Sequence, residues 1–233
     1  MSDNIVPYEE NGYTLYSCTN CPFAQRALRA FKASGVAHRV VEIDLQNKPS
    51  WYGQVNSQLK VPALRTPDGT ILIESLVIAE FVADAFPEAN LLPSDAIERA
   101  QLRLFIEIFI SRYIPFIYKT LTAANVDDQK AHAETLLAGL REISKELERQ
   151  WERPSGKGGP FWSNGKFGFA EIATASFVNL LVVLRHYRGV EVPDTEEYSA
   201  FLHWRDAFIK DPLFTEFNVD PDDLIPVYKK FAA

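Results

Sequence analysis

Two cysteines, Cys18 and Cys21, lie three residues apart and are the only cysteines of the chain. A strand predicted over 13–17 precedes them, and a helix predicted over 22–34 follows. Proline is favoured at the first position of a helix, so Pro22 makes Cys21 the N-cap. There the thiol faces unpaired N–H groups and the positive end of the helix dipole, which both stabilise a thiolate. We therefore expect Cys21 to be nucleophilic, with a pKa below the ordinary value of about 8.5.

The Cys-x-x-Cys spacing also fits a dithiol redox motif. In a thioredoxin-type dithiol, however, the first cysteine caps the helix and the second lies one turn inside it. Here the helix begins after the second cysteine, and the position one turn inside it belongs to Ala24, which offers no chemistry. We expect Cys21 to act alone and Cys18 to be inert in the loop. Three alternatives stay open: oxidation of Cys18, an occasional Cys18–Cys21 bridge, and a buried, purely structural Cys21.

The first 86 residues alternate between strand and helix patterns. Hydrophobic periodicity and turn residues predict strands over 13–17 and 38–43, then an irregular link and a β-hairpin over 61–73. A helix over 75–86 closes the unit, with Ser75 as its N-cap. The order β-α-β, link, β-β-α is that of a small α/β domain.

Helical periodicity dominates the rest of the chain. A linker bounded by prolines, 87–94, separates the first domain, 1–86, from an all-α domain, 95–233. Pro115 interrupts the first long helix, which we expect to bend or restart there. The helices are predicted over 95–123, 127–152, 169–188, 195–209 and at the C-terminus.

Composition and charge exclude several classes of protein. Of the 233 residues, 47 % are hydrophobic and 24 % are charged, which is typical of a folded globular protein and excludes a disordered or fibrous one. The net charge is −7 and no basic stripe is present, so neither nucleic acid nor a membrane surface is an expected partner. Two cysteines cannot form a disulfide framework, and we recognise neither a secretory signal nor an apolar run of membrane-spanning length. We expect a cytoplasmic protein.

Cys21-Pro-Phe-Ala resembles the start of omega-class glutathione transferases, in which a cysteine replaces the tyrosine or serine of other classes. The resemblance covers nearly the whole chain and extends to fungal and plant omega-like relatives. It implies the glutathione transferase fold: an α/β thioredoxin-like N-terminal domain and an all-α C-terminal domain. The further motifs that carry it are Asn47-Lys48-Pro49, Val61-Pro62, Glu74-Ser75, Leu92-Pro93, Pro115 in the fourth helix, and Trp204 followed eight residues later by Pro212.

The resemblance implies which residues of the first domain bind glutathione. Pro62 would be cis, so that the backbone of Val61 pairs with the cysteinyl part of glutathione like an added strand. Glu74 and Ser75 would hold its γ-glutamyl ammonium and carboxylate. Two more contacts are implied: Lys48 with the glycyl carboxylate, and Phe23 beside the substrate thiol. The alternatives are a trans proline, a capping serine, solvated charges and a plain hydrophobic contact.

The second domain would supply a hydrophobic acceptor site in a cleft facing Cys21. The implied contacts are Tyr113, Phe116 and Trp204, although aromatic residues at helical spacing also fit a core. One position departs from the family: Gly168, with Glu171 three residues later, replaces the usual serine or threonine of an N-capping box. Glycine has no side-chain oxygen, so we expect a helix start weaker by a few tenths of a kcal/mol.

The activity implied is glutathione-dependent thiol transfer. The Cys21 thiolate would attack a glutathione mixed disulfide or a glutathionyl ketone and become S-glutathionylated, and a second glutathione would resolve it. Fitting substrates are glutathionylated proteins, dehydroascorbate, small disulfides and S-phenacyl conjugates. The alternatives are conjugation of electrophiles, with Tyr16 or Ser17 activating glutathione, and non-catalytic binding of hydrophobic molecules. Glutathione is the expected co-substrate, no metal is expected, and the family implies a homodimer.

Overall fold

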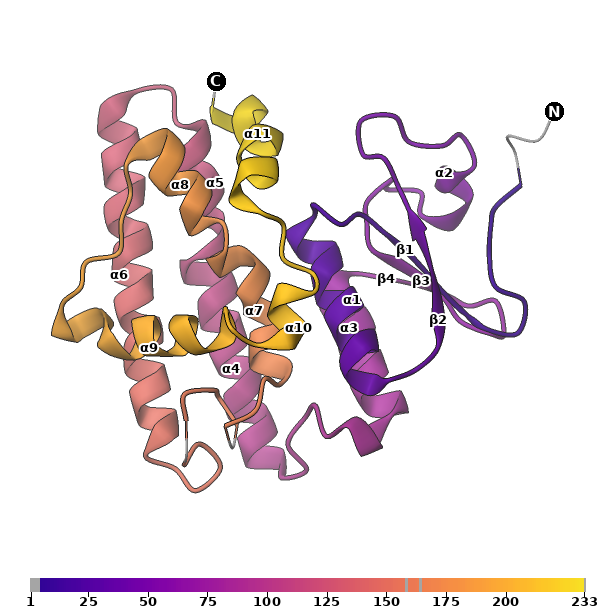
Figure 1. Ribbon diagram of the computed structural model, residues 1–233, viewed down its shortest axis with the longest axis horizontal. Helices are drawn as coiled ribbons and strands as arrows, with labels where there is room; N and C mark the ends of the chain where they lie inside the picture. The colour runs from indigo at the N-terminus through magenta and orange to yellow at the C-terminus, as the bar shows by residue number, and fades with distance from the viewer. Residues whose placement is uncertain (1–4, 158, 164, 233) are drawn as a thin grey trace. The chain divides into compact units, whose positions relative to one another are not determined.

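The computed structural model describes residues 5–157, 159–163 and 165–232 (Figure 1). The chain divides into two compact units, residues 1–92 and 93–233. The division falls inside the predicted linker 87–94, part of which forms a short 3-10 helix. The thioredoxin-like and helical architecture expected from the sequence is confirmed, with one unit of each kind.

The first unit is built on a mixed four-stranded sheet in the order β2-β1-β3-β4. Strand β1 pairs in parallel with β2 and antiparallel with β3, and β3 pairs antiparallel with β4. The elements of this unit are β1 (Tyr13–Ser17), α1 (Pro22–Ser34), β2 (His38–Glu42), α2 (Tyr52–Val55), β3 (Ala63–Arg65), β4 (Ile71–Ile73), α3 (Ser75–Ala85) and η1 (Pro87–Ala89).

Helix α1 carries the cysteine loop at its N-terminus and is fixed by an apolar face. Ala24, Ala27 and Phe31 on that face are fully buried, and α1 packs against α3 (Figure 1). Burying a side chain as large as Phe31 contributes about 2 kcal/mol. Gly35 ends the helix in the left-handed region, at φ 69°, which a residue with a Cβ rarely adopts. The start and end predicted for this helix are confirmed.

Two local expectations for the first unit are wrong. The link after β2 contains the short helix α2, which is too short to show a helical period in the sequence. Ser75 is the first residue of α3 and not its N-cap, and its Oγ accepts from Nη1 of the buried Arg26 at 3.2 Å. The N-cap is Glu74, whose backbone has φ 71°.

The second unit is helical in all its regular elements within the described residues. The predicted interruption at Pro115 is confirmed: the helix ends at Arg112 and restarts at Ile114. The predicted helix 169–188 is divided in two. The elements are α4 (Ala96–Arg112), α5 (Ile114–Thr122), α6 (Val126–Trp151), α7 (Phe169–Val178), α8 (Leu181–Arg188), η2 (Glu196–Tyr198), α9 (Ser199–Phe208), α10 (Pro212–Thr215) and α11 (Pro221–Ala232).

The start of α7 is held by a fully buried carboxylate. Oε2 of Glu171 accepts from the N–H of Gly168, and Oε1 accepts from the N–H of Trp162, each at 2.9 Å. Oε1 also accepts from Nε1 of Trp204 at 2.7 Å. Glycine offers no side-chain acceptor, so only the Glu171 half of the capping box is made. Burial raises the pKa of Glu171, while the three donors favour its carboxylate form.

One arginine joins three helix ends in this unit. Nε of Arg188 donates to the carbonyl of Thr120 at 3.2 Å, and Nη2 donates to the carbonyl of Leu121, at the end of α5. Nη2 also donates to the carbonyl of Ala232, the last residue of α11, at 3.0 Å. Nη1 donates to the carbonyl of Tyr187 in α8 at 3.1 Å.

One described segment, Phe169–Arg188, has the length and composition of a membrane-spanning helix. The segment is no uninterrupted apolar run, because it contains Glu171, Arg185 and Arg188 and is divided between α7 and α8. Its most apolar window is 72 % buried inside the structure, which is the burial of a core helix.

Candidate functional site

Cys21 is the N-cap of α1, as the sequence predicts, with extended backbone angles of φ −93° and ψ 117°. Pro22 occupies the first helical turn. The carbonyl of Cys21 accepts from the N–H of Gln25 at 3.1 Å, and its own N–H donates to the carbonyl of Cys18 at 3.0 Å. The loop therefore folds back tightly before the helix, and it brings both cysteines to one end of β1.

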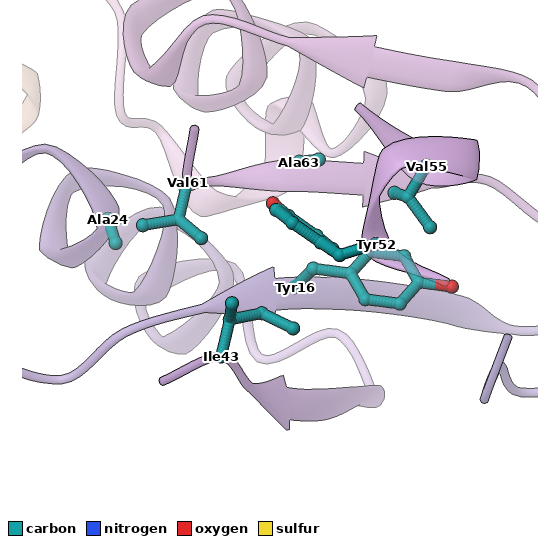
Figure 2. Packing of buried hydrophobic residues seen from close by; sticks show 7 residues of the cluster. All are labelled: Tyr16, Ala24, Ile43, Tyr52, Val55, Val61 and Ala63. Carbon is teal, nitrogen blue, oxygen red and sulfur yellow. The ribbon is translucent and has the colours of Figure 1, made fainter. Parts of the chain in front are cut away.

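Both cysteines pack against a buried cluster of the first unit, which we call the cysteine cluster. Figure 2 shows the seven residues of this cluster. Its members come from β1, α1, α2, β3 and the segments that follow β2 and precede β3. They are Tyr16, Ala24, Ile43, Tyr52, Val55, Val61 and Ala63. Tyr52 is fixed by its hydroxyl, which donates to the carbonyl of Lys60 at 2.7 Å. Helix α2 thus completes the wall against which the thiols lie.

The thiol of Cys21 is subject to opposing effects. Burial raises its pKa and is the largest of them. The backbone N–H groups of Ala24 and Phe23 and the guanidinium of Arg26 favour the thiolate and offset part of this rise. The predicted pKa below the ordinary value is therefore wrong for this structure, because desolvation of the half-buried thiol outweighs the helix terminus.

Cys18 is less suited to form a thiolate. The pKa of its thiol is raised to about 11, chiefly by burial and also by the negative charge of Glu42, while the N–H of Asn20 opposes the rise. Cys18 thus lacks the arginine and the two first-turn donors that act on Cys21. Both cysteines are free thiols in the structure. At neutral pH Cys18 is protonated, which agrees with the expectation that it is inert.

Three of the implied glutathione-binding residues lie close to Cys21 in the first unit. The Val61–Pro62 peptide bond is cis, as the resemblance implies, and Val61 belongs to the cysteine cluster. Ser75 is joined by Arg26 to α1, the helix that Cys21 caps. Val61, Pro62 and Ser75 are buried at this end of the sheet.

The other three implied residues of this unit are exposed. Glu74 precedes α3 with an exposed side chain and makes no side-chain cap to the helix. Phe23 is 37 % exposed in the first turn of α1, and the guanidinium carbon of Arg26 lies 5.5 Å from the centre of its ring. Lys48 lies in the exposed segment between β2 and α2. The contacts of these three with glutathione stay predictions.

The implied acceptor residues are mostly core residues of the second unit. Trp204 is fully buried and bonded to Glu171, and the hydroxyl of the fully buried Tyr113 donates to the carbonyl of Phe177 at 3.2 Å. Tyr113 and Trp204 are thus core residues, and their contact with an acceptor stays a prediction. Phe116 is half-buried, and Nζ of Lys119 lies 4.7 Å from its ring centre.

A cavity of about 540 Å³ does occur within the second unit, but its lining includes none of those three aromatic residues. It is lined by apolar side chains from α7 to α10, including Val178, Val182 and Phe214, and by the exposed ion pair of Arg185 with Glu191 at 2.8 Å. Among the described residues, no group of three or more His, Cys, Asp or Glu side chains is placed to hold a metal ion.

Sequence reasoning missed two charged residues of the site, Arg26 and Glu42. Arg26 is buried in α1 but lies on the side of the helix opposite Ala24, Ala27 and Phe31, so no apolar stripe in the sequence marks it as buried. Glu42 is exposed at the end of β2, and nothing in the sequence near it points to the cysteine loop. Its carboxylate accepts from the N–H of Thr19, between the two cysteines, at 2.7 Å.

Comparison with known proteins agrees with this geometry. The family model described as "Glutathione S-transferase, N-terminal domain" matches residues 15–90. Glutathione transferase Omega 1C from Trametes versicolor is 30 % identical, with a TM-score of 0.75, and the match covers 95 % of this chain and 97 % of that one. Glutathione S-transferase omega-1 from Sus scrofa is 28 % identical over 94 % of this chain and 85 % of its own length.

The fold is also shared outside the omega class. The Tau class glutathione S-transferase from mango superposes with a TM-score of 0.84 over 96 % of this chain and 100 % of that one, at 22 % identity. The chain belongs to the glutathione transferase family and is an omega-like member of it.

Proposed function

We propose that this glutathione transferase catalyses thiol transfer through an S-glutathionylated Cys21. The Cys21 thiolate attacks the glutathione sulfur of a mixed disulfide, a Cys21–glutathione disulfide forms, and the other sulfur leaves as a thiolate. The thiolate of a second glutathione then attacks the glutathione sulfur on Cys21. Glutathione disulfide is released, and the Cys21 thiolate is restored.

The observation that carries this proposal is the contrast between the two thiols. Cys21 has Arg26 and two first-turn N–H groups that favour its thiolate, whereas the pKa of Cys18 is raised to about 11. Burial raises the pKa of Cys21 as well, but the guanidinium and the two N–H groups favour its thiolate, and Cys18 lacks them; this contrast supports a route with a single enzyme cysteine. The position one turn into α1 is the fully buried Ala24, which cannot resolve a disulfide.

The same end of the sheet suits the binding of glutathione. We assign the backbone of Val61, set by the cis Pro62, to the cysteinyl part of the tripeptide. Ser75 and the first N–H groups of α3 would take the γ-glutamyl carboxylate, and Glu74 would take the ammonium. The remaining assignments are Lys48 to the glycyl carboxylate and Phe23 beside the thiol.

Fitting substrates are glutathionylated proteins, dehydroascorbate, small disulfides and S-phenacyl conjugates of glutathione. Two free cysteines are consistent with work in a reducing compartment, and we propose the cytoplasm. A homodimer, common in the family, is proposed as the working assembly.

The test is mass spectrometry of the intact protein after treatment with glutathione disulfide. We expect one added glutathione, about 305 Da, on the wild type and on Cys18→Ala, and none on Cys21→Ser. Peptide mapping should place the adduct on Cys21, and added glutathione should remove it. An adduct on Cys18 alone, or none at all on a protein that still binds glutathione, contradicts the proposal and favours conjugation or simple ligand binding.

A further inference from the structure

A single carboxylate reaches from β2 to the loop between the cysteines. In the parallel pair β1–β2, Glu42 lies opposite Ser17, the last residue of β1. Its Oε1 accepts from the N–H of Thr19 at 2.7 Å, and its Oε2 accepts from the Thr19 hydroxyl at 3.3 Å. Glu42 therefore uses both oxygens on one residue of the loop that follows β1.

Thr19 is held from its other side as well. Its carbonyl accepts from Nε2 of Gln25, in α1, at 2.8 Å. The loop is thus tied to β2 through the N–H of Thr19 and to α1 through its carbonyl. The turn from Cys18 to Cys21, closed by a 3.0 Å backbone bond, lies between these two ties. The position of Cys21 as N-cap depends on this loop, because no side chain caps α1.

The charge of Glu42 acts on the same loop. The titratable and charged groups around Cys21 are Arg26 in α1, Cys18 in the loop, Tyr52 in α2 and Glu42 in β2. Arg26 favours an anion at Cys21, and Glu42 disfavours one there and at Cys18. Two like charges close together repel, and this raises the free energy of the ionised thiol.

We propose that Glu42 is a positioning residue for the thiol transfer assigned above: its carboxylate orders the cysteine loop through Thr19, and its charge opposes a second negative charge in that loop. The opposed charge is the Cys21 thiolate in the first step and an incoming glutathione thiolate in the second. The proposal rests on the proposed function for its role in turnover, but the two effects on the loop can be measured without it.

Glu42→Gln separates the two effects, because a carboxamide keeps an acceptor for the N–H of Thr19 and loses the charge. In a Cys18→Ala background, we expect the pH midpoint for alkylation of Cys21 by neutral iodoacetamide to fall by about half a unit. At a pH below the midpoint, a shift of this size makes the alkylation of Cys21 about threefold faster. Glu88→Gln, which removes an exposed carboxylate from η1, is the matched control for net charge and should not move the midpoint.

Glu42→Ala removes the acceptor together with the charge. In hydrogen exchange followed by NMR, the Thr19 amide should exchange about tenfold faster in Glu42→Ala and close to the wild-type rate in Glu42→Gln. Thr19→Ala, which loses only the hydroxyl bond, should leave the alkylation midpoint unchanged.

The results that overturn the proposal are specific. An alkylation midpoint in Glu42→Gln equal to that of Glu88→Gln refutes the charge effect, and unchanged Thr19 exchange in Glu42→Ala refutes the ordering effect. Neither measurement needs glutathione. If both effects are seen but glutathione disulfide leaves no adduct on Cys21, the loop inference stands and the proposed function fails.

Discussion

The two helices that begin at the candidate site start differently from α4 and α6, two long helices of the second unit. The N-caps of α1 and α3 are Cys21 and Glu74, and neither makes a side-chain hydrogen bond that caps its helix. The N-cap of α4 is Asp95, whose Oδ1 accepts from the N–H groups of Ile97 and Glu98 at 2.9 Å. The N-cap of α6 is Asn125, whose Oδ1 accepts from the N–H of Asp128 at 2.8 Å.

This difference shows where the chain leaves backbone donors available. The first N–H groups of a helix need acceptors, and an aspartate or asparagine cap satisfies them within the protein. At α1 the N–H groups of Phe23 and Ala24 act on the Cys21 thiol, and at α3 we propose that the first N–H groups take a carboxylate of glutathione. An uncapped start is a local loss of stability of about 1 kcal/mol, which fits a site whose ligand supplies the acceptor.

The largest effect is expected at the start of α1. Cys21→Ser keeps an oxygen that can cap the helix but cannot form a disulfide. Reduction of glutathione mixed disulfides and of dehydroascorbate should fall at least about 100-fold, to background, whereas conjugation to an aryl halide should persist or rise. Both activities are measured on one preparation, with folding followed by circular dichroism. Near wild-type thiol transfer would move the chemistry away from Cys21.

The next effect is expected at the start of α7, where the cap is buried. Glu171→Gln replaces one accepting oxygen by an NH₂ group, which leaves one buried donor without an acceptor. We expect the free energy of unfolding in urea to fall by about 2 kcal/mol. Glu146→Gln, in an ion pair on α6, is the control and should change it by less than about 0.5 kcal/mol. Equal values for the two variants would show that the buried carboxylate does not hold α7.

At the start of α3, a substitution should weaken glutathione binding without lowering the stability of the fold. Glu74 has φ 71°, which is unfavourable for a residue with a Cβ, so Glu74→Gly relieves strain. Part of that gain is offset by the greater freedom of glycine in the unfolded chain, and we expect unchanged or slightly higher stability. The Kd of glutathione, measured by calorimetry, should rise about tenfold because the ammonium loses its partner. Unchanged affinity would remove Glu74 from the binding site.

A smaller effect is expected at the start of α4. Asp95→Ala should lower the free energy of unfolding by about 1 kcal/mol and leave glutathione affinity unchanged. Asp95→Asn keeps an accepting oxygen and should recover most of the loss. If Asp95→Ala weakened glutathione binding as much as Glu74→Gly, the distinction between capped and uncapped helix starts would not hold.

The smallest effect at neutral pH is expected for Cys18→Ala, which should leave thiol transfer within about twofold of the wild type. The raised pKa means that the folded chain holds this proton more tightly than the unfolded chain, whose thiol has the ordinary value of 9.0. The stability that follows from this is present below pH 9 and is lost as the pH rises through about 11. The difference in unfolding free energy between the wild type and Cys18→Ala should decline over that window, and a constant difference would argue against a buried, protonated thiol.

Local sequence signals predicted most of the first unit. Pro22 and Gly35 mark the two ends of α1 by their own backbone preferences, so its bounds could be predicted to the residue. The cis bond at Pro62 followed from the family motif that the chain carries. These features depend on a few neighbouring residues, and sequence reasoning handles such features well.

The remaining features of the site depend on residues distant in the chain. Glu42 reaches Thr19 across a parallel strand pair, and Arg26 engages Ser75 across two helices. Neither contact has a spacing that a sequence pattern can show. The pKa of Cys21 was misjudged for the same reason, because the helix terminus is visible in the sequence and the burial of the thiol is not. The burial of Trp204 could not be predicted either, because an aromatic residue in a core and one in a binding site look alike along a helix.

Arg188 makes the closing of the helical unit cooperative. Its guanidinium donates hydrogen bonds to carbonyl groups at the ends of α5 and α11 and of its own helix, α8. When the guanidinium detaches, carbonyl groups at the ends of three helices lose their hydrogen-bond donor. Fraying of the last turn of α11 is therefore linked to fraying of α5, more than 100 residues earlier in the sequence. A lysine has a single nitrogen and cannot serve all of these carbonyls at once. Arg188 therefore ties the last turn of the C-terminal helix to the ends of α5 and α8.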